Sequence, residues 1–401
     1  MHSRPCVRVG LVGAGFVADI HAHAYRDAGP VEAEIVAVAA ASEESAGRFA
    51  RRHGIADTYG DYRRLLQRDD VDLVDVCTPN DLHERVAVAA AEHGKHAACE
   101  KPLTGYFGGS TAARPVGETR KSLMLAEALQ SADRMIEAAV RAGTKLMYAE
   151  NWVYCPAIDR AASSPSELGG TILEIRAEES HSGSHAVYAK SWARAGGGSL
   201  MRLAPHPIGA ALYLKQCGGL WRDGRPVHPA WVTAEVGHLD RVAAFRAERT
   251  HWVADDWQDV ENWSALLIGF GDGTRAVIQA TDVSLGGIET PFEVRMSNGR
   301  VCCDISHSGM MRAFAPEPGV WGDAYLMEKV DHRGGWSYPS VDEHWLLGYP
   351  HEMRDFLACV AYDRQPRSTA VLGRQVVQVI YAAYQPAEEG RRIDLWRTDG
   401  P

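Results

Sequence analysis

The sequence predicts an α/β protein with an N-terminal doubly wound parallel sheet and a C-terminal α+β part that holds a large, mostly antiparallel open sheet. Over the first third of the chain, short apolar runs alternate with helix-like runs, which is the rhythm of parallel strands joined by crossover helices. Beyond about residue 150, longer runs of period two are joined by tight turns. The length of 401 residues also exceeds one ordinary domain.

The first predicted domain spans residues 1–150 and alternates strand and helix in order. The expected strands are residues 7–12, 34–41, 71–78 and 95–99. The expected helices are residues 16–28, 43–53 and 82–93. Pro79 stops the third strand and Gly94 ends the third helix, because proline and glycine interrupt regular structure. This order predicts a parallel sheet with helices on its faces.

The second predicted domain spans residues 151–401. Its expected strands are residues 171–178, 230–238, 264–270, 275–281 and 292–296. Gly271-Asp272-Gly273 and Ser297-Asn298-Gly299 are turn sequences of the kind that join antiparallel strands. Within the first domain, residues 104–120 are rich in Gly, Thr and Pro, so we expect a mobile loop there.

Composition excludes several classes of function. Apolar residues make up 46% and charged residues 23%, a globular balance that argues against a disordered chain. The net charge of -10 makes nucleic acid and anionic membranes poor partners. No apolar run approaches the roughly 18 residues of a membrane span. The 8 cysteines contain no Cys-x-x-Cys pair, so we expect neither a zinc ribbon nor a disulfide framework, and a cytoplasmic location.

A glycine-rich segment follows the first expected strand and carries the first chemical signal. Gly13-x-Gly15-x-x-Ala18 matches the dinucleotide fingerprint. Gly13 permits a tight turn, Gly15 lets the backbone approach a pyrophosphate at the positive end of the next helix, and Ala18 allows close packing of helix and strand. The segment therefore predicts a Rossmann-type domain that binds NAD or NADP.

The residue that would contact the ribose is less clear. A carboxylate usually ends the second strand of such a domain, but this chain has Ala40-Ala41-Ser42 there. Ser42 is able to bond a ribose hydroxyl or a 2′-phosphate, with Arg48 about one turn away, or it merely caps the helix that starts at Glu43. The choice between NAD and NADP stays open.

Further motifs, in this order and spacing, resemble one enzyme family. They are Thr78-Pro79-Asn80-Asp81-Leu82-His83, Gly94-Lys95-His96, Glu100-Lys101-Pro102, the stretch from Gly196 to His206, and Ala382-Ala383-Tyr384. With the fingerprint they resemble the Gfo/Idh/MocA family of glucose–fructose oxidoreductases and inositol dehydrogenases. The resemblance implies an NAD(P)-dependent oxidoreductase.

The resemblance also implies roles for individual residues. Lys101 matches the family lysine beside the nicotinamide, which stabilises the developing alkoxide of the substrate and relays its proton. Glu100 and Pro102 hold this lysine, and the bond before the proline is often cis. The expected cofactor-binding residues are Gly13, Gly15, Phe16, Val17, Ser42, Thr78, Pro79, Asn80, His83, Glu100 and Lys101.

His206 matches the second catalytic residue of the family, but its surroundings differ. Many members have an aspartate four residues earlier, where this chain has Arg202. On one continuous helix the two residues would share a face. An arginine cannot accept a proton, so an Asp–His relay is not expected and Lys101 is the better acid/base candidate. Two interpretations of Arg202 stay open: it binds substrate, or it pairs with Glu178 or Glu179.

Other polar and aromatic residues are expected at the substrate. The segment that contains His181, His185 and Trp192 is unusually polar for a strand end and suits a ligand rich in hydroxyl groups. Glu150 and Trp152 follow the last parallel strand and are also expected to contact substrate. A zinc site at His181, His185 and His206 is not expected, because no standard ligand spacing is present.

Together these features predict an enzyme that oxidises a secondary hydroxyl of a sugar, glycoside or cyclitol, or reduces the matching ketone. Two alternatives stay open: redox-neutral chemistry that uses bound NAD transiently, and a non-catalytic dinucleotide-binding regulator. The presence of Lys101 and His206 argues against the regulator. The C-terminal sheet is expected to form a homodimer or homotetramer, as the resemblance implies.

Overall fold

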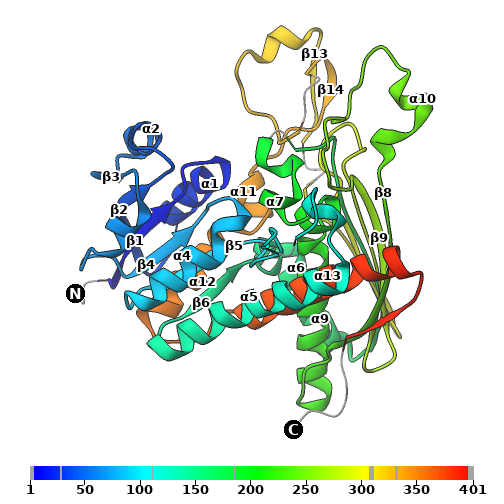
Figure 1. Ribbon diagram of the computed structural model, residues 1–401, viewed down its shortest axis with the longest axis horizontal. Helices are drawn as coiled ribbons and strands as arrows, with labels where there is room; N and C mark the ends of the chain where they lie inside the picture. Colours follow the sequence, from blue (N-terminus) through cyan, green and yellow to red (C-terminus); the bar gives the residue numbers. More distant parts are fainter. Residues whose placement is uncertain are drawn as a thin grey trace. The chain divides into compact units, whose positions relative to one another are not determined.

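Two compact units make up the part of the chain that the structure describes (Figure 1). This computed structural model describes residues 4–27, 29–110, 112–184, 186–306, 311–329 and 333–395. Unit 1 gathers residues 1–106, 126–154 and 348–377, and unit 2 gathers residues 107–125, 155–347 and 378–401. Each unit therefore combines separate segments, and the domain boundary at residue 150 stays a prediction.

Unit 1 contains a parallel sheet of six strands in the order β3-β2-β1-β4-β5-β6. The strands are β1 (Cys6–Val12), β2 (Glu32–Ala39), β3 (Asp57–Tyr59), β4 (Leu73–Val76), β5 (His96–Glu100) and β6 (Leu146–Ala149). The strand order reverses between β1 and β4, which pair directly. Ligands of doubly wound sheets bind at this switch point, beyond the carboxyl ends of the strands. The parallel N-terminal sheet is confirmed.

The helices of unit 1 alternate with these strands. They are α1 (Phe16–Ala24), α2 (Glu43–His53), α3 (Tyr62–Leu66), α4 (His83–Glu92) and α12 (Tyr349–Ala361), with the 3-10 turns η1 (Tyr25–Asp27), η2 (Asn80–Leu82) and η4 (Asn151–Tyr154). Two longer helices, α5 (Lys121–Ala142) and α13 (Ala370–Glu389), contribute residues to both units. The helix α12 comes from late in the chain and packs against α1 and β1.

Unit 2 contains a sheet of seven strands in the order β12-β11-β7-β10-β9-β8-β15. The strands are β7 (Ile172–Ser180), β8 (Pro229–Gly237), β9 (Trp263–Phe270), β10 (Arg275–Thr281), β11 (Pro291–Met296), β12 (Gly299–Asp304) and β15 (Ile393–Asp394). Only the pair of β7 and β10 is parallel among the pairs described. The mostly antiparallel sheet is confirmed.

Helices cover one face of this second sheet. The elements α6 (Pro156–Leu168), α8 (Ser199–Arg202) and α9 (Pro205–Asp223) pack against its strands or against one another. The remaining elements of unit 2 are η3 (Val116–Glu118), η5 (Val187–Lys190), α7 (Trp192–Ala195), η6 (Leu239–Arg241), α10 (Ala243–Arg246), β13 (Ala313–Ala315), η7 (Pro318–Trp321), β14 (Gly335–Ser337) and α11 (Glu343–Leu346). On β10, buried Ala276 and Ile278 alternate with exposed Val277, as expected for an open sheet.

The segment 104–120 has irregular backbone, as its composition predicts. Its regular structure among the described residues is the short turn η3. Thr104 is fully buried with its hydroxyl 2.6 Å from that of Ser131, and the Gly117 N–H donates to Asp259 over 3.0 Å. Thr104 is thus bonded within unit 1 and Gly117 within unit 2. The mobility of the segment stays a prediction.

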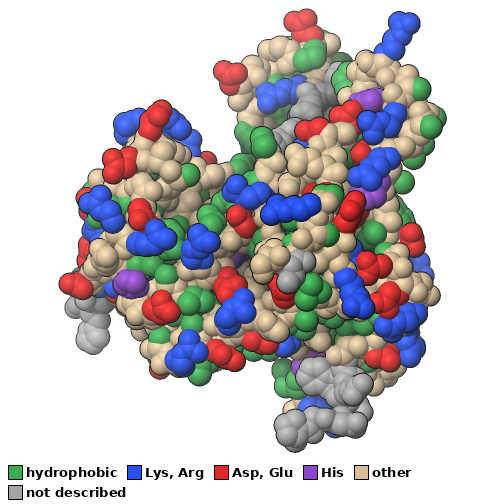
Figure 2. Space-filling view, in the orientation of Figure 1, with side chains coloured by type: hydrophobic (Ala, Val, Ile, Leu, Met, Phe, Trp, Pro, Cys, Tyr) green, Lys and Arg blue, Asp and Glu red, His purple; other side chains and the backbone are tan. Residues whose placement is uncertain are grey.

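The described surface carries charges of both signs. Lysine and arginine side chains are interspersed with aspartate and glutamate over the face in view (Figure 2). This mixture agrees with the slightly acidic composition rather than with a continuous basic stripe on that face. Among the described residues, no helix is both long and apolar enough to cross a membrane.

Candidate active site

The first turn after β1 has the geometry that a dinucleotide needs. Gly13 adopts a φ of +122°, and a Cβ there would lie 2.1 Å from the carbonyl oxygen of Cys77. No L side chain is tolerated in that space, so the glycine permits the close approach of β1 to the end of β4. The Gly13 N–H donates to the Ala39 carbonyl over 2.8 Å, which closes the turn.

The start of α1 leaves room and donors for a phosphate. Gly15 precedes the helix without a side-chain cap, and a Cβ there would have nothing within 4 Å. Phe16 is 60% exposed and Val17 is half-buried, while Ala18 is fully buried against the sheet. Uncapped N–H groups at a helix start favour anions. The residues present therefore fit the pyrophosphate of a dinucleotide.

The end of β2 does not decide between NAD and NADP. The exposed Ser42 caps α2, since its hydroxyl accepts from the Ser45 N–H over 3.2 Å. The alternative that Ser42 is a helix cap is thus confirmed, while its contact with a ribose stays a prediction. Arg48 forms an ion pair with Glu44 on the exposed face of the same helix.

His83 connects two of the predicted cofactor turns. It is fully buried, and its ring nitrogens lie 2.8 Å from the Pro102 carbonyl and 3.0 Å from the Thr78 carbonyl. Burial lowers its pKa, so the ring is neutral and donates to one carbonyl at a time. Pro79 precedes η2, whose first residue Asn80 is buried. His83 thus holds the two turns, and its contact with the cofactor stays a prediction.

Lys101 lies directly after β5, where the sheet presents its carboxyl ends. Its backbone N–H donates to the carboxylate of Glu100 over 3.0 Å. The bond between Lys101 and Pro102 is cis, as the resemblance implies. The carboxylate of Glu100 therefore fixes the backbone that carries the lysine.

Glu150 lies within electrostatic reach of Lys101. Burial raises the pKa of the Glu150 carboxyl to about 8, while the positive charge of Lys101 opposes this shift. The Tyr148 hydroxyl donates to the same carboxyl over 3.4 Å. Glu150 is therefore mostly protonated at neutral pH. Trp152 is 2% exposed and lies in the interior of unit 1; the substrate contacts of Glu150 and Trp152 stay predictions.

A buried group that sequence reasoning did not identify lies beside this turn. His21 on α1 contacts Asp75 of β4 over 2.9 Å and Glu100 of β5 over 3.1 Å. Asp75 also accepts from the Tyr25 hydroxyl over 3.1 Å. A signal was present in the sequence: Asp75 is a charged residue inside an otherwise apolar strand, which requires a buried partner.

In unit 2, Arg202 has a buried partner that was not expected from the sequence. It forms a buried ion pair with Asp282, directly after β10, and its guanidinium lies 4.6 Å from the centre of the Trp257 ring. Glu178 instead accepts from the Ser180 hydroxyl over 2.6 Å. The bridge from Arg202 to Glu178 or Glu179 stays a prediction. A structural ion pair does exist, and substrate contact by Arg202 stays a prediction.

The helix around His206 also differs from the expectation. Arg202 ends α8, and α9 begins at Pro205, so the two residues do not lie on one continuous helix. Proline has no N–H to continue the helical bonds, which explains the break. The Nε2 atom of His206 lies 3.9 Å from the carboxylate of Glu179, at the end of β7.

The other predicted substrate residues of unit 2 are mostly buried. His181 accepts the Gly183 N–H at its Nδ1 over 2.9 Å, and the same atom lies 3.7 Å from Asp282. Trp192 packs 4.9 Å from the Tyr384 ring. His185 lies outside the described residues. The substrate contacts of these residues stay predictions.

The glycine triplet before His206 is held by a buried acid. The carboxyl of Glu261 accepts the N–H groups of Gly198 and Leu200 over 3.1 and 3.0 Å, and the Tyr384 hydroxyl over 2.9 Å. Burial raises its pKa to about 7, although these bonds oppose the shift. A Cβ on Gly198 would lie 1.8 Å from the Glu261 carbonyl oxygen, so this contact requires glycine.

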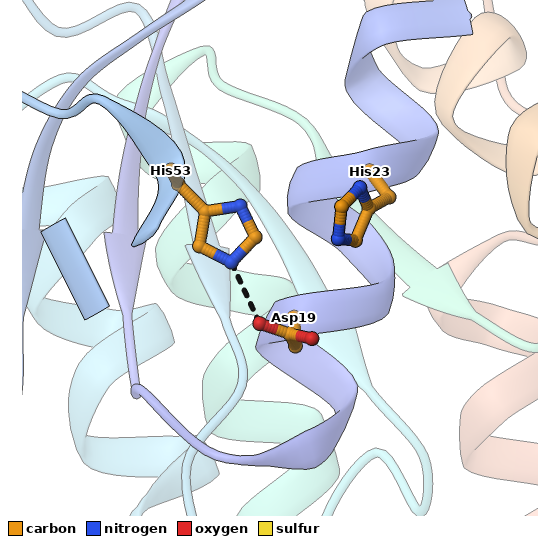
Figure 3. A group of neighbouring side chains, drawn as sticks. All are labelled: Asp19, His23 and His53. Atoms are coloured by element: carbon orange, nitrogen blue, oxygen red, sulfur yellow. Dashed lines mark hydrogen bonds and ion pairs between the residues drawn. The ribbon is translucent and has the colours of Figure 1, made fainter. Parts of the chain in front are cut away.

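Two groups among the described residues have the composition of metal ligands. One joins Asp19 and His23 of α1 to His53 of α2 (Figure 3). The His53 Nε2 lies 2.6 Å from Asp19, and Arg52 lies 2.8 Å from the same carboxylate oxygen. A guanidinium at that oxygen competes with a cation, so we interpret the group as an ion-pair connection between α1 and α2. The absence of a metal stays a prediction.

Known proteins resemble this chain along most of its length. It is 32% identical over 397 residues to D-apiose dehydrogenase from Paraburkholderia graminis, a match that covers 96% of this chain and 88% of that protein. Residues 7–122 match the oxidoreductase family GFO_IDH_MocA, which has an NAD-binding Rossmann fold. This chain belongs to the Gfo/Idh/MocA oxidoreductase family. The resemblance drawn from its motifs is confirmed.

Two other proteins similar to this Gfo/Idh/MocA oxidoreductase support the same class of enzyme. Levoglucosan dehydrogenase from Pseudarthrobacter phenanthrenivorans is 26% identical over 411 residues, covering 97% of this chain and 98% of that protein. The crystal structure of GenD2 from gentamicin A biosynthesis, in complex with NAD, matches with a TM-score of 0.78 and 25% identity over 99% of this chain and 98% of that one. The predicted class, an NAD(P)-dependent oxidoreductase, is confirmed, and the phosphate preference stays open.

Proposed function

We propose that this oxidoreductase oxidises a secondary hydroxyl of a sugar, glycoside or cyclitol, or reduces the matching ketone. The observation that carries the proposal is the position of Lys101 directly after β5, within electrostatic reach of the mostly protonated carboxyl of Glu150. The relatives named D-apiose dehydrogenase and levoglucosan dehydrogenase support a carbohydrate substrate.

The proposed chemistry assigns a separate task to each residue. The dinucleotide accepts or supplies the hydride when it is bound. Lys101 stabilises the negative charge that develops on the substrate oxygen, because an ammonium favours an alkoxide. In oxidation, the ionised form of Glu150 accepts, through the Lys101 ammonium, the proton that the substrate hydroxyl loses. In reduction, the protonated form of Glu150 returns that proton, and both forms are accessible because its pKa is about 8. His206 is the second candidate for proton transfer, and its Nε2 atom lies 3.9 Å from the carboxylate of Glu179.

A panel assay tests this proposal. Purified protein is mixed with NAD or NADP and with levoglucosan, D-apiose, an inositol, or a simple primary alcohol as a negative control, and the absorbance of the reduced cofactor is followed. The proposal predicts reduction with at least one polyol and none with the primary alcohol. If the protein binds the dinucleotide but turns over no polyol and no matching ketone, the result would favour the alternative of a non-catalytic dinucleotide-binding regulator.

The cellular location and the oligomeric state are also part of the proposal. We infer a cytoplasmic enzyme, because the 8 cysteines include no Cys-x-x-Cys pair and all 8 are free in the structure. We further infer a homodimer or homotetramer through the half-exposed face of the C-terminal sheet. The exposed Val277 at the middle of β10 supports this, because an apolar side chain on an open sheet face favours association.

A further inference from the structure

The buried group around His21 presents one ring to two acids. The His21 side chain is fully buried, with its Nδ1 atom 2.9 Å from Asp75 and its Nε2 atom 3.1 Å from Glu100. The first contact has hydrogen-bond geometry, whereas the second is a close ion-pair contact without good alignment. The same ring therefore connects β4 and β5, the two strands that end at the Thr78 and Lys101 turns.

The geometry limits the protonation state of this ring. A neutral imidazole has one N–H and one lone pair, so it can donate to only one of the two carboxylates. The other carboxylate would then face a lone pair at about hydrogen-bond distance, without solvent to screen the repulsion. An imidazolium carries an N–H on each side, so it donates to Asp75 and turns a positively charged N–H rather than a lone pair towards Glu100. The arrangement therefore requires the charged form.

The neighbours of His21 agree with a single positive charge there. Asp75 also accepts from the Tyr25 hydroxyl over 3.1 Å and from the Cys77 thiol over 3.4 Å. From α12, the Tyr349 ring lies 5.8 Å from the imidazole. Burial alone would lower the pKa of His21, but the charge of Asp75 raises it well above the ordinary value.

The charges in this interior balance when His21 is protonated. Glu352 of α12 is fully buried within electrostatic reach of His21, and burial raises its pKa well above the ordinary value. Glu352 is therefore neutral, as Glu150 mostly is. The positive charge of His21 then faces Asp75 and Glu100, the two acids that contact its ring. A neutral His21 would leave one buried negative charge without compensation, which is costly.

We propose that His21 is a permanently protonated positioning residue whose imidazolium joins Asp75 to Glu100 and, through the bond from the Lys101 N–H to Glu100, holds Lys101 in place. This inference rests on the proposed function, because it assumes that Lys101 acts on the substrate. His21 itself acts through Glu100 and is not assigned any contact with substrate.

A metal ion at His21, Asp75 and Cys77 is the competing explanation, since these three also have the composition of a metal site. A metal would bind the cysteine as a thiolate. Burial and the charge of Asp75 raise the pKa of the Cys77 thiol, which disfavours that form. The hydrogen bond between His21 and Asp75 uses the same atoms that a metal would need.

Nitrogen NMR of the full chain with labelled histidine tests the charge state directly. The His21 signals are assigned from their loss in His21→Gln. We expect both ring nitrogens to stay protonated over the pH range above about 6.5 in which an ordinary histidine becomes neutral. His83 is the internal control, because it is equally buried but neutral. A neutral His21 in this range, or stoichiometric metal in the purified protein, would overturn the proposal.

Kinetics test the positioning role. His21→Gln should lower kcat about tenfold to a hundredfold, the cost of a small misplacement of a catalytic group, while the Kd for dinucleotide measured by calorimetry stays within about twofold. His23→Gln, on the same helix but exposed, should leave kcat unchanged. A His21→Gln protein that folds and keeps full kcat would contradict the role.

A second variant covers the case in which His21→Gln does not fold. Glu100→Gln keeps the size of the side chain but removes one of the two charges that face His21. The proposal then expects the imidazolium to lose a proton within the tested pH range, and an unchanged NMR titration would contradict it. If no polyol is turned over by the wild-type chain, the proposed function fails, whereas the NMR result still decides whether His21 is charged.

Discussion

At the residue scale, the chain stabilises its buried charges by pairing each with a group that is distant in sequence. Arg202 and Asp282 are separated by 80 positions, and His21 and Asp75 by 54. A buried ion pair adds little net stability by itself, but the loss of one partner leaves an uncompensated charge in the interior. Substitutions at these residues should therefore lower the stability of the protein.

Arg202→Ala should lower the free energy of unfolding by about 3–5 kcal/mol, because Asp282 would remain buried and unpaired. Denaturant unfolding measures this, with Arg176→Ala as the control, since Arg176 forms only an exposed pair with Glu174. If Arg202 also contacts substrate, the same variant should bind polyol about 1.5–3 kcal/mol more weakly. An unchanged free energy of unfolding together with weaker polyol binding would show that the ion pair with Asp282 does not stabilise the fold.

The two fingerprint glycines should respond differently to substitution. Gly15→Val should abolish dinucleotide binding and keep the fold, because a side chain there enters open space on the phosphate side. Gly13→Ala should destabilise the protein, because its Cβ would meet the Cys77 carbonyl at 2.1 Å. Calorimetry with NAD and thermal unfolding separate the two effects. A folded Gly15→Val protein with normal cofactor affinity would refute the placement of the pyrophosphate.

At the element scale, the short helix α8 is attached to β9 through the acid Glu261, which precedes that strand. The bonds from Gly198 and Leu200 to the Glu261 carboxyl place the glycine triplet at the start of α8. The pKa of this carboxyl is raised by burial from 4.5 to about 7. Between pH 4.5 and about 7, Glu261 keeps its proton in the folded chain and loses it in the unfolded chain. The free energy of unfolding therefore falls as the pH rises through this range.

Glu261→Gln should remove this part of the pH dependence. In the wild-type chain, Glu261 contributes a loss of about 3 kcal/mol at most in the free energy of unfolding between pH 4.5 and about 7. The variant carries no titrating group there, so its stability should vary less over the same range. Urea unfolding at several pH values measures the difference, with Glu178→Gln as the control. If the free energy of unfolding varies with pH in the same way in the wild type and in Glu261→Gln, this pH dependence does not come from Glu261.

The sequence was sufficient for the elements whose signals are local. The fingerprint, the alternation of strands and helices in the first part of the chain and the turn after β5 follow from glycine and proline positions and from apolar periodicity. The short elements β3 and α3 were not predicted, because 3 and 5 residues give too little periodicity. The break between α8 and α9 was missed although Pro205 marks it, since the pattern of Arg202 and His206 alone suggested one helix.

The site was predictable to the extent that its residues occur in motifs. Lys101 and Gly15 were identified in this way. Asp282, Glu261 and His21 were not, because their roles depend on contacts between strands and helices that are far apart in the chain. Only the charge of Asp75 within an apolar strand indicated beforehand that a buried partner existed.

At the scale of the whole molecule, the open face of the C-terminal sheet is the expected surface for self-association. If the chain is a homo-oligomer through this face, Val277→Glu should reduce the molar mass in solution towards that of a monomer, because a charge in a packed interface is costly. Light scattering measures the mass. The control is Val320→Glu, which is also exposed but lies outside the sheet. An unchanged assembly with Val277→Glu would exclude this part of the face as the interface.

The central claim is that this oxidoreductase removes a hydride from a carbinol carbon with the help of Lys101. The most direct measurement uses a polyol that is turned over in the panel assay and carries deuterium at that carbon, with mass analysis of both products. We expect deuterium in the reduced nicotinamide, an equal amount of ketone, and turnover lower by about 10²–10⁴ in Lys101→Met with unchanged cofactor affinity. A rearranged or cleaved product without net reduced cofactor, or full turnover by Lys101→Met, would contradict the account.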